Sequence, residues 1–239
     1  IMLGFPHEAE ALKFSSDIDG ENPFADVRVR QAVAHAINVP AILQTIMRGN
    51  AEPVNQLVSA AMSGYSEALG AAPAYDPEKA RALLAEAGYA DGFSFGLKCP
   101  NNRYLNDEAV CQAVTGMLAQ VGIDATLEAM PVNNYWPELR ADNFDMYLLG
   151  WSPGTFDAEH PIRFLVATPN EEKKLGSWNF GGFSNARIDT LQAENGELRG
   201  LLEAQGRDMS DLSSVRTQLQ AELEAARARE RAAKLWERF

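Results

Sequence analysis

The chain has 239 residues, of which 46% are hydrophobic and 23% are charged, a composition typical of a globular protein. Its formal net charge is −12, and residues 1–186 hold 12 basic against 23 acidic side chains, a balance of −11. Because so acidic a surface repels phosphate backbones, the composition argues against a nucleic-acid partner. No apolar run approaches the ~20 residues that a membrane-spanning helix needs.

The N-terminal third is predicted to hold a short strand and two helices. The apolar run at residues 1–6 indicates a strand, which Pro6 ends. Asp26 suits the N-cap of a helix whose apolar residues recur at helical spacing, at Val29, Val33, Ala36 and Ile37. A second short helix is expected from Pro40 to Met47. Residues 51–75, rich in Gly, Ser, Ala and Pro, are expected to form a long irregular segment.

The segment from residue 76 to residue 151 predicts an α/β sheet with helices packed on its faces. Its clearest helix is "YDPEKARALLAEAGY", which Asp76 caps and Gly88 ends. Strands are then predicted at residues 93–99, 123–131 and 144–151, with helices between them at residues 106–122 and 133–142. Such alternation of strands and helices is typical of an α/β fold.

Beyond residue 187 the pattern changes to a coiled-coil-like repeat. Steps of three and four residues from Ile188 visit fifteen positions, of which ten are apolar. Gly196, Gly200 and Gly206 weaken the first third of this predicted helix. The repeat predicts either a seam against another helix or self-association through Leu198, Leu202, Leu212, Leu219 and Leu223. We therefore expect a lobe of residues 1–191 and a separate helical tail of residues 192–239.

The two cysteines, Cys99 and Cys111, lie twelve positions apart, at the end of a predicted strand and inside the following helix. That placement allows a structural disulfide, and a pair of buried thiols is the alternative. Two cysteines and three histidines without ligand spacing predict no metal site, and the sequence suggests no cofactor.

Two loops that leave predicted strands carry the candidate binding residues. Ligands of open α/β sheets sit beyond the carboxyl ends of the strands. If the strands at residues 93–99 and 144–151 are neighbours, Arg103 and Asp157 face one crevice with opposite charges, and Tyr104 and Trp151 line it with aromatic surface. The alternatives are a solvated Arg103, an Asp157 that stabilises a turn, and a Trp151 that packs in the core.

Five phrases in chain order resemble the extracellular solute-binding proteins that feed ABC importers, in the family with dipeptide-, oligopeptide- and nickel-binding members. They are "DVRVRQAVAHAI", "YDPEKARALLAEAGY", "NDEAVCQAVTGMLAQVGI", "FDMYLLGW" and "FSNARIDTL". The resemblance implies an α/β fold, the second lobe of a periplasmic-binding-protein type II-like fold, which in this family closes with a first lobe around a ligand. It also implies that the chain is a fragment or a fusion in which the first lobe is missing.

The resemblance further implies roles for the two charged residues. In dipeptide-binding members an arginine in the strand-to-helix loop meets the ligand carboxylate, and Arg103 takes that position. Those members also place an aspartate three residues after a Gly-Trp pair, against the ligand ammonium. Here that position is Gly154, and the nearest acid, Asp157, lies three residues further on.

The sequence thus predicts a partial substrate-binding component of a peptide-type ABC transporter, in the periplasm or outside the cell, with no enzymatic activity. Its expected partners are a small peptide or similar polar solute, the permease subunits and, through the C-terminal helix, a second copy. Two rival interpretations are a coiled-coil scaffold or non-functional fusion fragment, and a hydrolase that uses Asp157, Glu159 and His160. The hydrolase is the weaker rival, because no nucleophile–base pair accompanies these residues.

Overall fold

A computed structural model of the chain describes residues 2–6, 22–69 and 72–206. The chain divides into two compact units, Ile1–Ala186 and Arg187–Phe239. The sequence placed this boundary after residue 191, whereas the helix that leads into the second unit begins at residue 186. Within the described ranges, no helix combines the length and the apolarity that crossing a bilayer requires.

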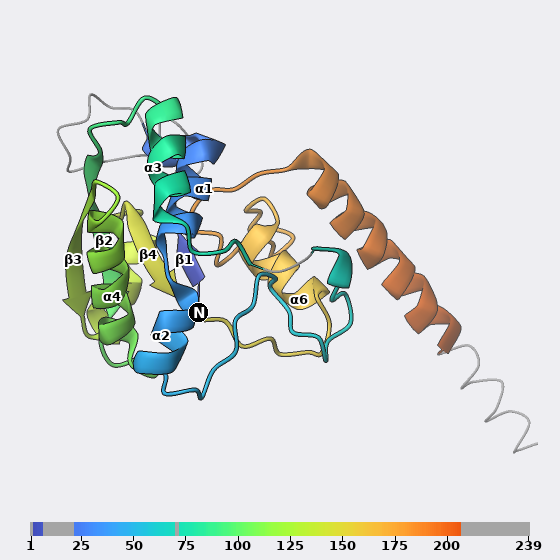
Figure 1. Ribbon diagram of the computed structural model, residues 1–239. Helices are drawn as coiled ribbons and strands as arrows, with labels where there is room; N and C mark the ends of the chain where they lie inside the picture. The colour runs from blue at the N-terminus through green and yellow to red at the C-terminus, as the bar shows by residue number, and fades with distance from the viewer. Residues whose placement is uncertain (1, 7–21, 70–71, 207–239) are drawn as a thin grey trace, which may run out of the picture. The chain divides into compact units, whose positions relative to one another are not determined.

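The first unit is built on a mixed sheet whose strands, in the described residues, follow the order β1-β4-β2-β3 (Figure 1). Their bounds are β1 Met2–Gly4, β2 Phe93–Pro100, β3 Ile123–Met130 and β4 Met146–Leu149. β2 runs parallel to β3 on one side and to β4 on the other, and β1 pairs antiparallel with β4. The predicted strands are therefore present, although β4 is shorter than expected because the chain leaves the sheet at Gly150.

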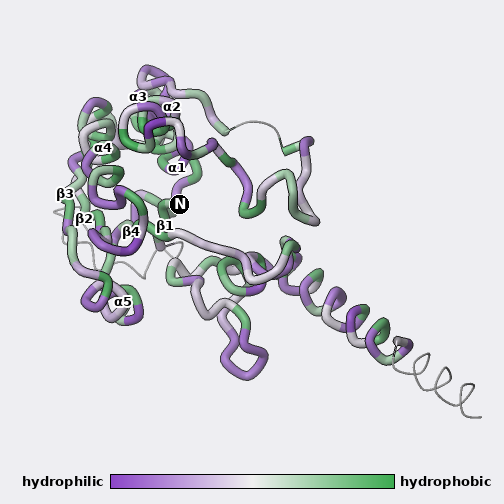
Figure 2. Tube along the Cα trace, turned by 90° about the horizontal axis from the view of Figure 1, so that it is seen from below, coloured by the Kyte–Doolittle hydropathy of each residue, from purple (hydrophilic) through white to green (hydrophobic). Residues whose placement is uncertain are grey.

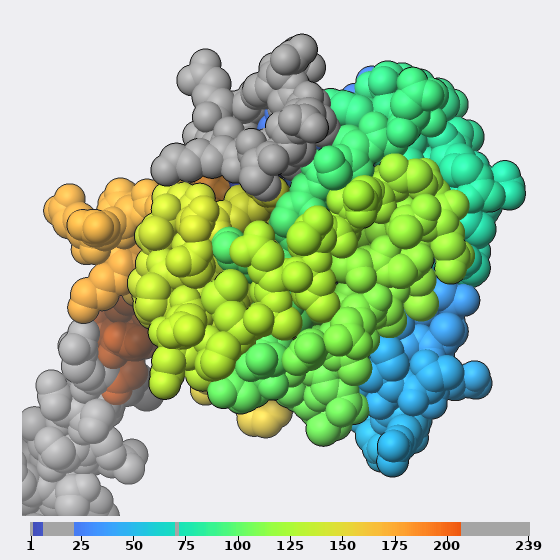
Figure 3. Space-filling view, turned by 90° about the vertical axis from the view of Figure 1, so that its left-hand side faces the viewer, coloured from blue at the N-terminus to red at the C-terminus, as the bar shows by residue number. Residues whose placement is uncertain are grey.

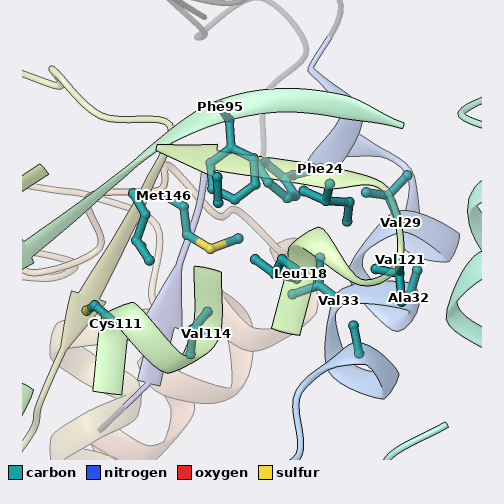
Figure 4. Packing of buried hydrophobic residues seen from close by; sticks show 14 of the residues in the cluster. Phe24, Val29, Ala32, Val33, Phe95, Cys111, Val114, Leu118, Val121 and Met146 are labelled. Carbon is teal, nitrogen blue, oxygen red and sulfur yellow. The ribbon is translucent and has the colours of Figure 1, made fainter. Parts of the chain in front are cut away.

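One face of the sheet carries the main core, together with the helices α1 Val27–Ala36, α2 Val39–Thr45, α3 Pro77–Glu86 and α4 Asp107–Ala119. The predicted caps are in place: the side chain of Asp26 accepts from the backbone N of Arg28, and that of Asp76 accepts from the backbone N of Lys79. Apolar residues spaced along α1 and α4 meet the alternate residues of β2 and β4 (Figure 4). α4 and β3 lie side by side on the outer surface of the unit (Figure 3).

The opposite face carries a smaller core under α5, Val132–Arg140. Tyr135 and Leu139 of this helix are fully buried against Tyr147 and Leu149 of β4. The hydroxyl of Tyr135 donates to the carbonyl of Leu148 at 2.6 Å, which satisfies both polar groups inside the core. β4 is thus buried on both faces.

Short helical turns complete the first unit: η1 Pro23–Ala25, η2 Glu67–Leu69, α6 Glu159–Pro161 and η3 Ile162–Val166. The last two were not predicted from the sequence, and His160 lies in α6. Helical periodicity was not visible there because the turn is so short and contains Pro161.

The described part of the second unit is one helix, residues 186–206. The predicted repeat continues at Leu212, Leu219 and Leu223, which lie outside the described residues. A long coiled coil therefore stays a prediction.

Candidate functional site

The two loops singled out in the sequence leave the same edge of the sheet. β2 and β4 are parallel neighbours, with Leu97 opposite Met146 and Lys98 opposite Tyr147. The loops that follow them meet where the hydroxyl of Tyr104 donates to the carbonyl of Gly150 at 3.2 Å. The adjacency expected from the sequence is therefore present, at the edge where α/β folds bind ligands.

A buried carboxylate holds the first of these loops. Oδ2 of Asp107 accepts from the backbone N of Arg103 at 2.8 Å and from that of Tyr104 at 2.9 Å. Oδ1 of the same side chain accepts from the backbone N of Glu108 at 3.0 Å. Asp107 is only 3% exposed, so these bonds form in a poorly hydrated environment. Sequence reasoning missed this role, although an acid in the first turn of a helix is a recognisable signal.

A disulfide ties the same strand end to the following helix. The Sγ atoms of Cys99 and Cys111 are bonded, and their Cα atoms lie 6.6 Å apart. Both side chains are fully buried in the main core. Of the two alternatives that the sequence left open, the structure has the disulfide.

The charges of Arg103 and Asp157 do not pair. Arg103 is exposed, and its guanidinium lies over the ring of Tyr104, 5.4 Å from the centroid. Oδ1 of Asp157 accepts from the backbone N of Glu159 at 2.8 Å, a local turn bond of the kind weighed as the alternative. Among the ion pairs between described residues, none joins Arg103 to Asp157. The two residues share an edge of the sheet, but each makes a local contact.

A cavity of about 580 Å³ opens beside Trp151. One wall is the segment of residues 54–69, which the sequence described only as irregular, and another is formed by Ala158 and Ile162. No charged side chain is among the residues that line it, and of the four predicted site residues only Trp151 does so. The two polar side chains of the wall make local bonds, Asn55 to the carbonyl of Leu69 and Gln56 to the backbone of Ser66. The cavity therefore offers mainly apolar and aromatic surface.

An aromatic cluster positions Trp151. Its ring lies 5.5 Å from that of His160, 5.9 Å from that of Phe164 and 5.9 Å from that of Trp178, measured between centroids. Nε1 of Trp151 and Nδ1 of His160 are buried and have no hydrogen-bond partner in the described part of the chain. Buried nitrogens without partners are uncommon in folded proteins, and an acceptor on a ligand or on another segment would satisfy them.

A charged network lies on the second face of the sheet, below the loops. Nζ of Lys98 in β2 contacts Glu128 of β3 at 2.7 Å and Glu138 of α5 at 3.2 Å. Burial alone lowers the pKa of Lys98, but its bonds to the two glutamates outweigh burial and raise that pKa. Burial also raises the pKa of Asp145, which the hydrogen bond from the backbone N of Gly96 only partly offsets. The sequence did not reveal this network, because its members come from separate elements.

No cluster in the described ranges suits a metal ion, since none brings together three or more His, Cys, Asp or Glu side chains in a suitable arrangement. Asp157, Glu159 and His160, the residues of the hydrolase alternative, follow one another on one short turn. The backbone N of Gly154 approaches Nε2 of His160 at 3.4 Å, and the bond from Glu159 to Asp157 is made by the backbone. These contacts are those of a structural turn.

Comparison with known proteins places the chain in a family. The model of "Bacterial extracellular solute-binding proteins, family 5 Middle" matches residues 3–172. Glutathione-binding protein GsiB of Escherichia coli (strain K12) is 34% identical over 179 residues, which is 73% of this chain and 34% of GsiB. The chain thus spans about a third of the length of the curated relatives it matches.

Solved structures share the fold. HbpA2 from Haemophilus parasuis superposes with a TM-score of 0.67 at 22% identity, over 80% of this chain and 35% of HbpA2. The periplasmic binding protein DppA from Helicobacter pylori, solved in complex with the peptide STSA, gives a TM-score of 0.64 at 23% identity, over 80% of this chain and 35% of DppA. With its mixed sheet, its loops at one edge and the match over residues 3–172, the chain belongs to family 5 of the bacterial extracellular solute-binding proteins.

Proposed function

We propose that this chain is the substrate-binding part of an ABC importer, and that its solute is a small peptide or a similar compound with an uncharged, apolar side group. The observation that carries the proposal is the cavity of about 580 Å³ beside Trp151, at the carboxyl end of β4, in a chain of this family. Its size suits a small organic molecule or one side chain with the backbone that carries it.

The lining of the cavity favours an apolar group. Met2, Val54, Leu57, Leu69 and Ile162 surround it, and Trp151 adds an aromatic surface on which a flat or branched group can pack. A charged group there would lose its hydration without meeting an opposite charge, because the lining has no charged side chain. The cavity would therefore take a neutral side group and leave the charged ends of the solute outside.

Arg103 is a suitable partner for such an end. Its guanidinium is exposed on a loop that Asp107 holds, at the same edge of the sheet. The guanidinium lies over the ring of Tyr104, and its N–H groups lie in its own plane. These N–H groups can therefore donate to a carboxylate of the solute. In this proposal Arg103 recognises a carboxylate, while Asp157 serves mainly to form the turn before α6.

The relatives bear on the class of solute and on the compartment. GsiB is named a glutathione-binding protein, and DppA was solved in complex with the peptide STSA. The ligand is a short peptide in both cases. We extend this to binding and release of a solute outside the membrane, in the periplasm, with permease subunits as partners and no covalent chemistry. The disulfide between Cys99 and Cys111 supports an oxidising compartment.

Calorimetric titration of the 239-residue chain tests the proposal. The probes are glutathione and three dipeptides that share an N-terminal alanine and differ at the second residue, which is leucine, phenylalanine or glutamate. Burial of one such apolar side chain contributes about 2 kcal/mol, so the leucine and phenylalanine peptides should bind roughly 30-fold more tightly than the glutamate peptide.

The matched variants are Trp151→Ala, which removes a wall of the cavity, and Phe156→Ala, which truncates a side chain of the same loop that is 83% exposed and does not line the cavity. We expect Trp151→Ala to remove the preference for apolar peptides and Phe156→Ala to keep it. Equal affinity for all three dipeptides, or no binding at millimolar concentration, would contradict the proposal. Peptide or ester turnover abolished by His160→Ala would favour the hydrolase instead.

A further inference from the structure

The helix of residues 186–206 carries a row of exposed leucines. Leu191, Leu198, Leu201 and Leu202 are 49%, 60%, 63% and 66% exposed, and hydrophobic and hydrophilic residues alternate along the helix (Figure 2). Leu191, Leu198 and Leu202 are separated by steps of seven and four residues, which place their side chains on one face. Leucines exposed on one face of a helix commonly mark a surface that another helix covers.

Three of these leucines fit one heptad register, and Leu201 lies beside it at position g. If Ile188 takes position a, then Leu191 and Leu198 take position d and Leu202 takes the third position a. The same register continues in the sequence outside the described residues, with Met209 at a and with Leu212, Leu219, Leu223, Ala226 and Ala233 at further a and d positions. Ten of the fifteen a and d positions from Ile188 are apolar, and the others are Asn195, Gln205, Arg216, Glu230 and Glu237. A repeat with this share of apolar positions is typical of a coiled coil.

The glycines of the helix avoid the seam. In this register Gly196, Gly200 and Gly206 take positions b, f and e. They weaken the isolated helix, which increases its need for a partner, and none of them occupies an a or d position.

Asn195 indicates how many helices meet. It occupies position a between Leu191 and Leu198, both at d. A single asparagine at an a position hydrogen-bonds to its counterpart across a parallel pair, and it specifies register and a two-stranded state at a cost in stability. An asparagine facing only apolar residues would be unsatisfied, so its position disfavours an unrelated apolar partner.

The flanking charges fit a second copy in parallel. Position g of one helix faces position e of the next heptad on its partner. Glu194 at g would meet Arg199 at e of the second copy. Residues 187–239 hold 9 basic and 10 acidic side chains, a balance of −1, so two copies of this segment can approach where two copies of residues 1–186, each at −11, repel.

We propose that the helix of residues 186–206 joins two copies of this chain in a parallel, two-stranded coiled coil whose register Asn195 sets. The seam lies outside the family match, which ends at residue 172, so the pairing is an addition to the solute-binding fold and does not depend on which solute binds. Each dimer would present two solute-binding units to the importer.

Sedimentation of the full chain tests the pairing. We expect a species of twice the chain mass of 26.2 kDa at about 100 µM. Leu202→Asp, which places a charge in the seam, should raise the dimer dissociation constant by at least about tenfold. Glu203→Gln, a neighbouring change at position b, should leave the constant unchanged. A wild-type monomer at that concentration, or an effect of Glu203→Gln equal to that of Leu202→Asp, overturns the proposal.

Charge exchange tests the parallel register. Glu194→Arg and Arg199→Glu should each weaken self-association, because each places like charges across the seam, whereas an equimolar mixture of the two variants should pair as well as the wild type. Glu197→Arg at position c is the matched control for a changed net charge. Failure of the mixture to recover pairing overturns the register.

A cysteine at the seam reports the orientation. Leu198→Cys places equivalent d positions opposite each other only in a parallel pair, so oxidation should give a covalent dimer on a non-reducing gel, while Glu197→Cys should not. The native cysteines are already joined within the chain. Covalent dimers from both variants alike, or from neither, overturn the parallel arrangement.

Discussion

Replacing Asp107 by asparagine tests whether one buried carboxylate builds the binding edge. The new side chain is isosteric, but one oxygen becomes an NH₂ group that cannot accept a hydrogen bond. In the native loop three backbone N–H groups point at the carboxylate, those of Arg103, Tyr104 and Glu108. Whichever way the substituted amide is turned, at least one of these donors faces another donor.

The cost follows from the bonds that change. Hydrogen bonds to a charged group contribute about 1.5–3 kcal/mol each, and neutral ones about 0.5–1.5 kcal/mol. Three charge-assisted bonds would give way to at most two neutral ones, a loss that lies between about 1.5 and about 8 kcal/mol. The loop at residues 101–106 is largely exposed and can relax, so we expect a loss of about 2–3 kcal/mol in the free energy of unfolding.

Urea unfolding followed by circular dichroism measures this loss, and Glu108→Gln is the matched control. Glu108 is the next acid in the helix, and its side chain contacts only Gln112 among the described residues, at 3.3 Å. Asp107→Asn should also speed hydrogen exchange at the amides of Arg103 and Tyr104 and weaken solute binding, because Arg103 would lose its fixed position. A change below about 0.5 kcal/mol, or one equal to that of Glu108→Gln, would refute the reasoning.

Two further predictions concern the disulfide and the buried acid. The twelve-residue separation of Cys99 and Cys111 gives the disulfide a chain-entropy contribution of about 3 kcal/mol to stability. Reductant should therefore lower the free energy of unfolding of the wild type by that amount and leave that of the Cys99→Ala/Cys111→Ala variant unchanged. Equal effects of reductant on the wild type and the variant would count against the disulfide. Burial raises the pKa of Asp145 above its usual 3.8, so the stability that its protonated form contributes is present below that pH and is lost as the pH rises through the folded pKa. The stability of Asp145→Asn relative to the wild type should therefore increase as the pH rises from about 4, and a difference that does not vary with pH would contradict the burial effect.

Local structure could be predicted from the sequence because the determinants lie within a few residues of each other. Asp26 and Asp76 cap the helices that begin directly after them. Gly88 and Gly122 follow the ends of α3 and α4 with φ of 93° and 92°, a conformation that glycine adopts without strain. The alternation of strands and helices predicted the α/β sheet, and the shared edge of β2 and β4 followed from it.

Whether Arg103 and Asp157 point into one crevice with opposite charges could not be judged in the same way. Sequence spacing places two loops at one edge of a sheet, but the direction of a side chain depends on its nearest hydrogen-bond partners. For Asp157 a backbone N–H two residues away accounts for one carboxylate oxygen, and for Arg103 the ring of the next residue lies closest. Local contacts of this kind need no ordering of distant segments, so they form without the entropic cost of a long-range pair.

The sequence by itself determined the main helices and strands of the described sheet unit, the caps at which several of them begin, and which heptad positions in the C-terminal segment are apolar. Only the tertiary structure decided which distant residues meet: Lys98 with glutamates from two other elements, and Trp151 with the segment of residues 54–69 around a cavity. The physical reason is that periodicity records the geometry of one element, whereas a cavity or a buried ion pair arises from packing between elements, which no spacing along the chain encodes.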